Sequence, residues 1–287
     1  MRYNDSKKAS IFGIIGNIFL SLIKGICAFL FNSQAMKADF FNSAGDVFSS
    51  IMTFIGNRVA SKPSDKDHDL GHGKAEYIYS FIISIAMIIA SYEVFKSSIL
   101  ALINKNIYKF SIWLVIVYLV TIVVKFILFT YTKYLYKKNN NLLLKANCID
   151  HRNDFILTSL NLAACLFSLK NIYFLDGVMG MAISIWIFIS AIKIFMESYD
   201  VLMDKSIDEA TKNKVYDIIF RHEEIKLVNH FNATPVGYKY QISFTIFVDG
   251  NLSTFASHEI ANNLEKEIDK KIDEIYLTVI HVNPIDN

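Results

Sequence analysis

The chain has 287 residues, of which 53% are hydrophobic and 20% are charged. This composition is too apolar for an ordinary soluble domain, and the apolar residues form long runs of the kind that cross a membrane. With a formal net charge of only +2, the chain lacks the strongly basic character that favours nucleic-acid binding. The composition therefore predicts a polytopic α-helical membrane protein and excludes a nucleic-acid-binding protein.

Six stretches of the chain are long enough to cross a bilayer as helices, which takes about 20 residues each. The third and fourth stretches are the most continuously apolar, whereas polar residues interrupt the second and the fifth. The six predicted spans cover residues 10–31, 35–60, 75–100, 109–136, 142–169 and 172–200.

Lysine and arginine residues are distributed unevenly among the short loops. The N-terminus and the loops at 58–74 and 133–145 carry most of them, whereas the opposite loops hold only Lys105, Lys109 and Lys170. Because positively charged loops remain in the cytoplasm, the first set is predicted to be cytoplasmic. With six spans, the C-terminus is then cytoplasmic as well.

After about residue 204 the sequence becomes more charged and its periodicity is mixed. Pro235 and Gly237 are expected at a turn between two strands. The order α-β-β-α-β predicts a small α+β domain, of ferredoxin-like or metallochaperone-like type, over residues 205–287, following a membrane domain over residues 1–204. About 80 residues is a small size for independent folding, so pairing with a second copy is expected. Helical patterns cover 208–222 and 253–271, and strand patterns cover 225–232, 238–248 and 274–282.

Two of the predicted spans contain pairs of polar residues at a helical spacing. Asn42 and Asp46 are four residues apart in the second span. Asp150 and Asp154 are four residues apart in the fifth. On a helix this spacing places both members of a pair on one face, one turn apart. If the two faces meet, four oxygen-bearing side chains converge, and a divalent cation is the simplest counter-charge for carboxylates inside a bilayer.

Other residues in the spans admit different interpretations. Lys24 and Lys125 are single charges that can pair or extend to the interface, too few to neutralise three carboxylates. The polar residues could also serve only to join helices, Asn42 above all, since Asn often bridges helices by hydrogen bonds. His151 lies one residue off the face of Asp150, and we expect a structural role for it.

A loop with the sequence PSDKDHDLGHGKAE follows the second span. The six-span layout, the paired polar residues, this loop and the α+β tail together resemble the cation diffusion facilitator family over nearly the whole chain. Members of that family are homodimers that export divalent metal from the cytoplasm in exchange for protons. The resemblance implies a homodimer in a bacterial plasma membrane whose partners are metal ions, protons and lipid. The positions that match the family's transport site are Asn42, Asp46, Asp150 and Asp154.

The donor types at these four positions indicate which metal is carried. Zinc-transporting relatives usually have histidine in this site, whereas all four positions here offer oxygen. Imidazole suits zinc, and carboxylate or carbonyl oxygen suits harder ions such as manganese. Asn42 in place of a carboxylate and Asp150 in place of histidine resemble the manganese branch. We expect Mn²⁺ as the substrate, with Fe²⁺, Co²⁺ or Zn²⁺ as alternatives, and no prosthetic group.

Proton exchange has a physical basis in the same residues. Three carboxylates crowded in a medium of low dielectric constant repel one another, which raises their affinity for protons. Metal entry then expels protons, and proton entry on the far side expels metal.

The resemblance also implies functional residues in the loop after the second span. Asp65, His68 and His72 match the family's second metal site, although a solvated loop with incidental histidines is the alternative. Lys74 and Asp204 match a charge pair that steadies the junction between the membrane and tail domains.

In the tail, the resemblance implies a further metal site. His230, His258 and His281 match three ligands of a two-metal site found in some family members. Thr245 and Asn283 stand where further ligands are expected, so ordinary surface or packed histidines remain the alternative.

Other classes of membrane protein fit the sequence less well. Tyr199 and Asp200 resemble part of an intramembrane aspartyl protease, but no Gly-x-Gly-Asp partner and no HExxH motif accompany them, so we expect no enzyme. A membrane metal sensor does not need ligands at membrane depth. A channel remains an alternative that flux measurements distinguish from a carrier.

Overall fold

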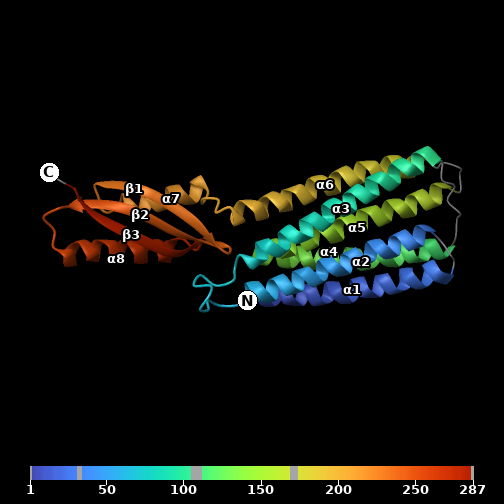
Figure 1. The fold of residues 1–287 in the computed structure, drawn as a ribbon, viewed down its shortest axis with the longest axis horizontal. Helices are drawn as coiled ribbons and strands as arrows, with labels where there is room; N and C mark the ends of the chain where they lie inside the picture. Colours follow the sequence, from blue (N-terminus) through green and yellow to red (C-terminus); the bar gives the residue numbers. More distant parts are fainter. Residues whose placement is uncertain (1, 31–33, 105–111, 169–173, 286–287) are drawn as a thin grey trace. The chain divides into compact units, whose positions relative to one another are not determined.

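The computed structural model describes residues 2–30, 34–104, 112–168 and 174–285. Lys105, Lys109 and Lys170 lie outside these ranges. Within them, six long helices precede a smaller α+β tail (Figure 1). The helices are α1 (Arg2–Leu30), α2 (Gln34–Ala60), α3 (Ala75–Asn104), α4 (Ile112–Asn139), α5 (Leu142–Ser168) and α6 (Phe174–Leu202).

Each of the six predicted spans coincides with a long helix, and the main difference is at the start of the chain. α1 begins at Arg2, whereas the apolar pattern predicted a start near residue 10. The added turns are polar, and Asp5 within them accepts a hydrogen bond from Lys138 of α4 at 2.7 Å. This ion pair joins the first turns of α1 to the end of α4. The local sequence pattern does not predict it, because the two residues are far apart in the chain.

Many large apolar side chains of the helices are exposed, and many of their polar side chains are buried. Three segments of the described chain are long and apolar enough to cross a membrane: Asn4–Cys27, Ala75–Leu100 and Ile112–Asn139. In α2, buried polar side chains recur every three or four residues and so follow one face of the helix. Large apolar side chains such as Leu22 and Ile89 are instead exposed. The buried polar residues of α2 include Ser43, Asp46, Ser50, Thr53 and Asn57.

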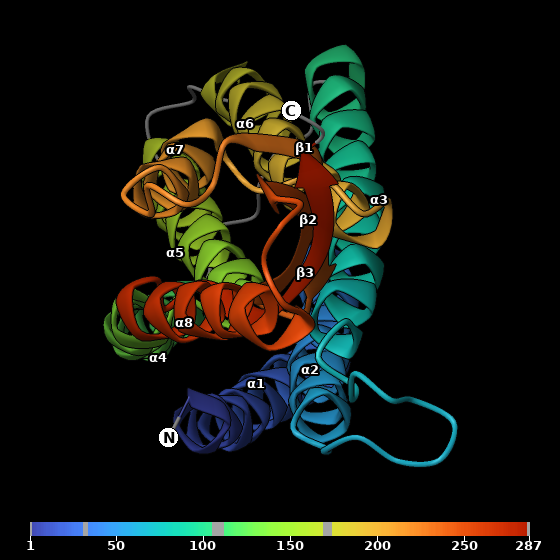
Figure 2. The same cartoon turned by 90° about the vertical axis from the view of Figure 1, so that its left-hand side faces the viewer.

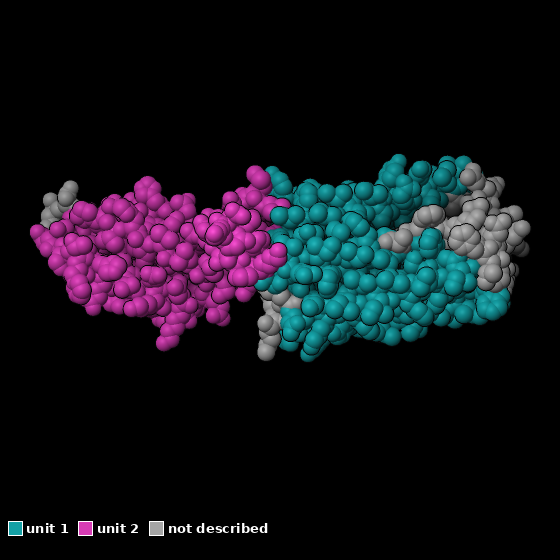
Figure 3. All heavy atoms as spheres, turned by 60° about the horizontal axis from the view of Figure 1, so that its bottom comes forward, with its two compact units in different colours: residues 1–61, 75–199 teal, residues 62–74, 200–287 magenta. Residues whose placement is uncertain are grey.

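This arrangement is that of an integral membrane protein, because lipid solvates the apolar exterior and the helices satisfy their own backbone groups. Two compact units make up the chain (Figure 3). The first contains residues 1–61 and 75–199, and the second contains residues 62–74 and 200–287. The loop between α2 and α3 therefore belongs to the same unit as the tail.

The tail has the predicted order α-β-β-α-β. The sheet order is β1-β2-β3, with β1 and β2 antiparallel and β2 and β3 parallel. Parallel neighbours need a crossover connection, and α8 provides it. The elements are α7 (Glu209–Ile219), β1 (Leu227–Val236), β2 (Lys239–Asp249), α8 (Thr254–Lys271) and β3 (Ile275–Ile285).

The core of the tail lies between the sheet and its two helices. Alternate residues of β2, from Ile242 to Val248, are buried, as strand geometry requires for one covered face. They pack in one cluster with Ile219 of α7 and Leu264 of α8. Figure 2 shows both helices on the same side of the strands.

Local signals explain where the tail elements begin. Asp208 caps α7 by accepting from the Thr211 backbone N–H at 3.0 Å, and Ser253 caps α8 in the same way. Hydrogen bonds from the Thr211 hydroxyl and backbone hold the pKa of Asp208 below its ordinary value. The predicted turn position of Pro235 is wrong, because Pro235 pairs with Tyr240 inside β1. An edge strand tolerates a proline, which lacks the N–H.

We expect Leu264→Ala to destabilise the tail by about 2–5 kcal/mol, because it leaves a cavity in a fully buried position. Faster hydrogen–deuterium exchange at β2 amides of the full-length protein measures the loss. Phe255→Ala on the same helix is the control, since the Phe255 side chain is 78% exposed. Equal exchange in the two variants would contradict the assignment of this core.

Candidate metal centre

Two of the predicted carboxylates meet at a lysine of α4. Lys125 Nζ donates to Asp46 Oδ2 of α2 at 2.7 Å and to Asp154 Oδ2 of α5 at 2.5 Å. The three side chains are 1%, 8% and 12% exposed, respectively. Three helices thus bring opposite charges together where water has little access, and each charge is stabilised mainly by the others.

Asp150 completes the carboxylate cluster. One ligand atom from each of Asp150, His151 and Asp154 lies within 4.8 Å of the other two, a spacing that a single metal ion can bridge. Asp150 Oδ2 is buried and, among the described residues, accepts no hydrogen bond. A buried carboxylate oxygen without a donor is costly, and a bound cation removes that cost.

His151 lies in this group, although the helical spacing placed it off the face of Asp150. The His151 side chain is fully buried, and neither ring nitrogen has a hydrogen-bond partner within the described part of the chain. An unpartnered imidazole beside two carboxylates is available as a further nitrogen donor. Asn42 lies on α2, one turn before Asp46, but its side chain is outside the described part of the structure.

The role of Lys125 was open in the sequence, where pairing and extension to the interface were both possible. The position of Lys125 within α4 nevertheless favours pairing over extension to the interface. Lys125 is near the middle of an apolar helix, too far from either end for its head group to reach the interface. A lysine at that depth requires a carboxylate partner. Which carboxylates it contacts depends on how α4 packs against α2 and α5.

Two further contacts hold the helices that carry the cluster. Asn17 of α1 donates to the backbone carbonyl of Asp46 at 3.1 Å and to Ser50 Oγ at 2.9 Å. Glu76 of α3 accepts from the Leu142 backbone N–H at 2.6 Å, at the first residue of α5. The first N–H groups of a helix have no partner within it, so a buried glutamate there fixes where α5 begins. The sequence did not predict this function of Glu76, because its partner Leu142 is 66 residues away along the chain.

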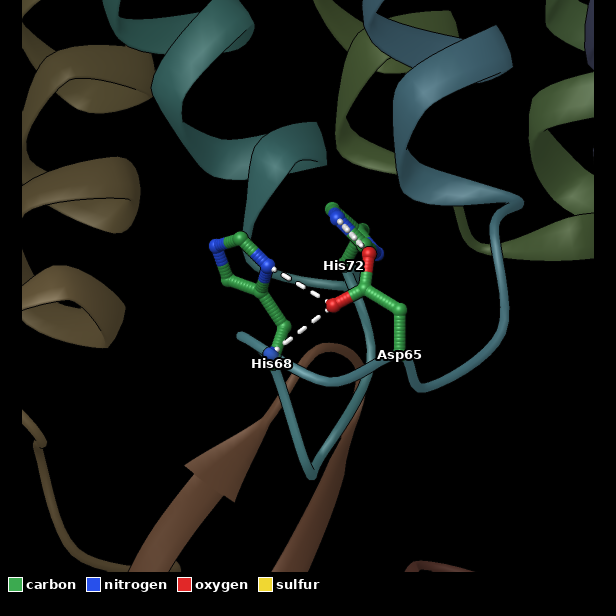
Figure 4. Close-up of side chains that lie close together, drawn as sticks. All are labelled: Asp65, His68 and His72. Atoms are coloured by element: carbon green, nitrogen blue, oxygen red, sulfur yellow. Dashed lines mark hydrogen bonds and ion pairs between the residues drawn. The ribbon is translucent and has the colours of Figure 1, made fainter.

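A second cluster lies in the loop between α2 and α3. Figure 4 shows the Asp65 carboxylate between the rings of His68 and His72. His68 Nδ1 is 3.2 Å from Asp65 Oδ1, and His72 Nε2 is 3.5 Å from Asp65 Oδ2. The three ligand atoms lie within 4.8 Å of one another, so this loop can also hold a metal ion.

The backbone of the loop orients these ligands. His72 Nδ1 lies 3.2 Å from the carbonyl oxygen of Pro63. A carbonyl only accepts, so this contact favours a proton on Nδ1 and leaves the Nε2 lone pair facing Asp65. Partial desolvation raises the pKa of Asp65, but hydrogen bonds from the backbone N–H of Asp67 and from His68 outweigh it and hold the pKa below its ordinary value. Asp65 is therefore ionised and available as a ligand at neutral pH.

The remaining predicted residues are the charge pair Lys74 and Asp204 and the three histidines of the tail. Lys74 Nζ donates to Asp204 Oδ1 at 2.6 Å. His230 is in a bulge of β1 with a positive φ of 56°, and His281 pairs with Thr245 across β2 and β3. Within the described residues of one copy, His230, His258 and His281 do not form a cluster of the kind seen at the other two sites.

An apolar helical exterior around buried carboxylates is typical of an integral membrane protein that handles cations. The chain belongs to the cation efflux family, since residues 10–203 match the cation efflux transmembrane domain and residues 207–285 match the cation efflux protein cytoplasmic domain. This confirms the resemblance to the cation diffusion facilitators. Members of the family are transporters.

Several curated relatives align over almost their whole length. An uncharacterized transporter of Methanocaldococcus jannaschii is 28% identical over 98% of this chain and 99% of its own. The manganese efflux system protein MneP of Bacillus subtilis is 27% identical over 99% of this chain and 97% of its own. MneS of the same organism is 28% identical over 99% of both chains.

We expect the loop cluster to bind a divalent ion such as Zn²⁺, which accepts imidazole and carboxylate ligands. The measurement uses a chain that carries Asp46→Ala, so that the membrane cluster contributes less to the measured metal binding. In that background, His68→Ala should weaken Zn²⁺ binding at least about tenfold. Isothermal titration of the full chain measures this. Asp69→Ala, a change at an exposed neighbour, should leave the affinity unchanged. If His68→Ala and Asp69→Ala behave alike, the loop is not a metal site.

Proposed function

We propose that the chain exports Mn²⁺ from the cytoplasm in exchange for protons. The observation that carries this proposal is the buried cluster of carboxylates from α2 and α5, in a chain of the cation efflux family. Two relatives that align end to end are named manganese efflux proteins. The proposed transport site consists of Asn42, Asp46, Asp150 and Asp154.

The donor set supports manganese as the cargo. Three carboxylates and an amide oxygen suit a hard divalent ion better than they suit zinc. His151 adds one nitrogen donor to the group. Zn²⁺, Fe²⁺ and Co²⁺ are therefore the competing substrates, and because most sites bind zinc more tightly than manganese, discrimination depends on ligand type and geometry.

Proton exchange follows from the crowding of like charges. Asp150 lies beside Asp154 within a buried cluster, and ionised carboxylates at that spacing repel one another strongly. When metal is absent, protons relieve the part of the repulsion that Lys125 does not offset, and a divalent ion relieves it when metal is bound. The two ligands therefore compete for one set of oxygens, which is the requirement for antiport.

The proposal includes the arrangement in the cell. Both termini and the Asp65 loop face the cytoplasm, as the distribution of Lys and Arg predicts. The protein acts as a homodimer in a plasma membrane, with the tail contributing to self-association. In this arrangement the loop cluster meets metal on the side from which it is exported.

Asp46→Ala should reduce Mn²⁺ flux at least about 100-fold, because the change removes a ligand and leaves Lys125 without one of its partners. Asn42→Asp should retain transport but change the ratio of Mn²⁺ to Zn²⁺ flux, because it replaces an amide oxygen by a carboxylate. Metal-resolved uptake into everted membrane vesicles measures both. Asp273→Ala, a change at an exposed carboxylate of the tail, is the control. If neither Asp46→Ala nor Asn42→Asp alters the flux of any metal, the proposed site is wrong.

Metal movement should respond to a proton gradient of either sign. Proteoliposomes with an acidic lumen should accumulate Mn²⁺, because protons leaving the lumen drive metal inward, and reversing the gradient should reverse the net flux. The Asp46→Ala protein in matched liposomes controls for leakage. Flux that ignores the imposed gradient would refute antiport while leaving metal transport intact.

A further inference from the structure

The candidate metal centre contains a cation of its own. Lys125 Nζ contacts one oxygen of Asp46 and one oxygen of Asp154 at the same time, at 2.7 and 2.5 Å. Its side chain is 1% exposed, so the ammonium depends on these carboxylates and not on water for its stabilisation. The two oxygens that it bridges belong to residues of the proposed transport site.

A metal ion and this ammonium cannot use the same oxygens together. Small divalent ions bind carboxylate oxygen at about 2.0–2.2 Å, closer than the ammonium does. A divalent ion between Asp46 and Asp154 would therefore occupy the volume that Nζ fills, with like charges in contact in a region of low dielectric constant. Lys125 must withdraw for these two oxygens to bind metal, and its flexible four-carbon stem allows the movement.

Asp150 offers a route for the exchange. Asp150 interacts with Lys125 through the electrostatic field, but the Asp150 Oδ2 atom accepts no hydrogen bond from the described residues. An arriving ion can therefore bind Asp150 first and then displace the ammonium from Asp154, within the same group of ligand atoms. The carboxylates are never left without a cation during this exchange.

We propose that Lys125 is a tethered competitor of the transported metal. It occupies the oxygens of Asp46 and Asp154 between transport events, withdraws when metal binds, and returns to displace the metal on release. In this role Lys125 lowers the affinity of the site and stabilises the metal-free carrier, whose carboxylates are otherwise costly to bury. The inference rests on the proposed transport site.

The test compares variants at position 125 in the full-length protein, with Mn²⁺ as the probe. All variants carry His68→Ala and His72→Ala, so that the loop cluster does not contribute to binding. Lys125→Met, which removes the charge and keeps the length of the side chain, should lower the Kd for Mn²⁺ at least about tenfold, because a bound competitor has been removed. The maximal Mn²⁺ flux should fall at least about tenfold, because release loses its displacing cation.

Matched controls separate charge from packing. Lys125→Arg retains the positive charge and should keep the Kd within about threefold of the parent, against the tenfold shift that marks loss of charge. Leu128→Met, at a buried position of the same helix, should leave both Kd and flux unchanged. Lys125→Gln serves as a second neutral variant if Lys125→Met does not elute as a single species by size-exclusion chromatography.

The outcomes distinguish this inference from the proposed function. A Kd that is unchanged or higher in the neutral variants overturns the tethered competitor, and so does tighter binding with undiminished flux. Asp46→Ala in the same background tests the site itself. If it binds and transports Mn²⁺ as the parent does, the proposed transport site fails. If it loses both while the neutral Lys125 variants match the parent, only the role of Lys125 fails.

Discussion

Charge buried away from water is the constraint on which the membrane domain depends. Asp46, Lys125 and Asp154 come from three different helices, and each is nearly inaccessible to solvent. Removing one member of such a group leaves the others uncompensated, typically at a cost of about 3–5 kcal/mol. The helices α2, α4 and α5 therefore cannot change their relative positions freely. Any movement that carries metal has to keep these charges paired with one another or with the cargo.

Contacts from α1 and α3 stabilise the positions of the helices that carry these charges. Asn17 holds the backbone at Asp46 from α1, and Glu76 holds the first turn of α5 from α3. Both contacts use backbone groups, so they fix the height and rotation of a helix without occupying the carboxylates themselves. The helices that carry Asp46 and Asp150 thus have stabilising contacts that do not use the carboxylate oxygens of these two residues.

Much of the fold could be predicted because its signals are local. Apolar runs predicted six helices, and alternating patterns predicted the order of the tail elements. The spacing of Asp150 and Asp154 placed both on one face of α5. Contacts between helices could not be predicted from local patterns. Nothing near Lys125 in the sequence identifies Asp46, 79 residues away, as its partner. The early start of α1 also depends on a distant residue of α4.

The polar character of α5 has a consequence for how the protein enters the membrane. A charged residue at the centre of a single helix costs about 2.5–3.5 kcal/mol to insert, and α5 carries Asp150, Arg152 and Asp154 near its middle. Neighbouring helices satisfy two of them. The Arg152 guanidinium lies over the Trp186 ring of α6, and Asp154 pairs with Lys125 of α4. As a separate segment, α5 would be poorly retained in lipid. We expect its stable insertion to depend on the contacts that α5 makes with α4 and α6.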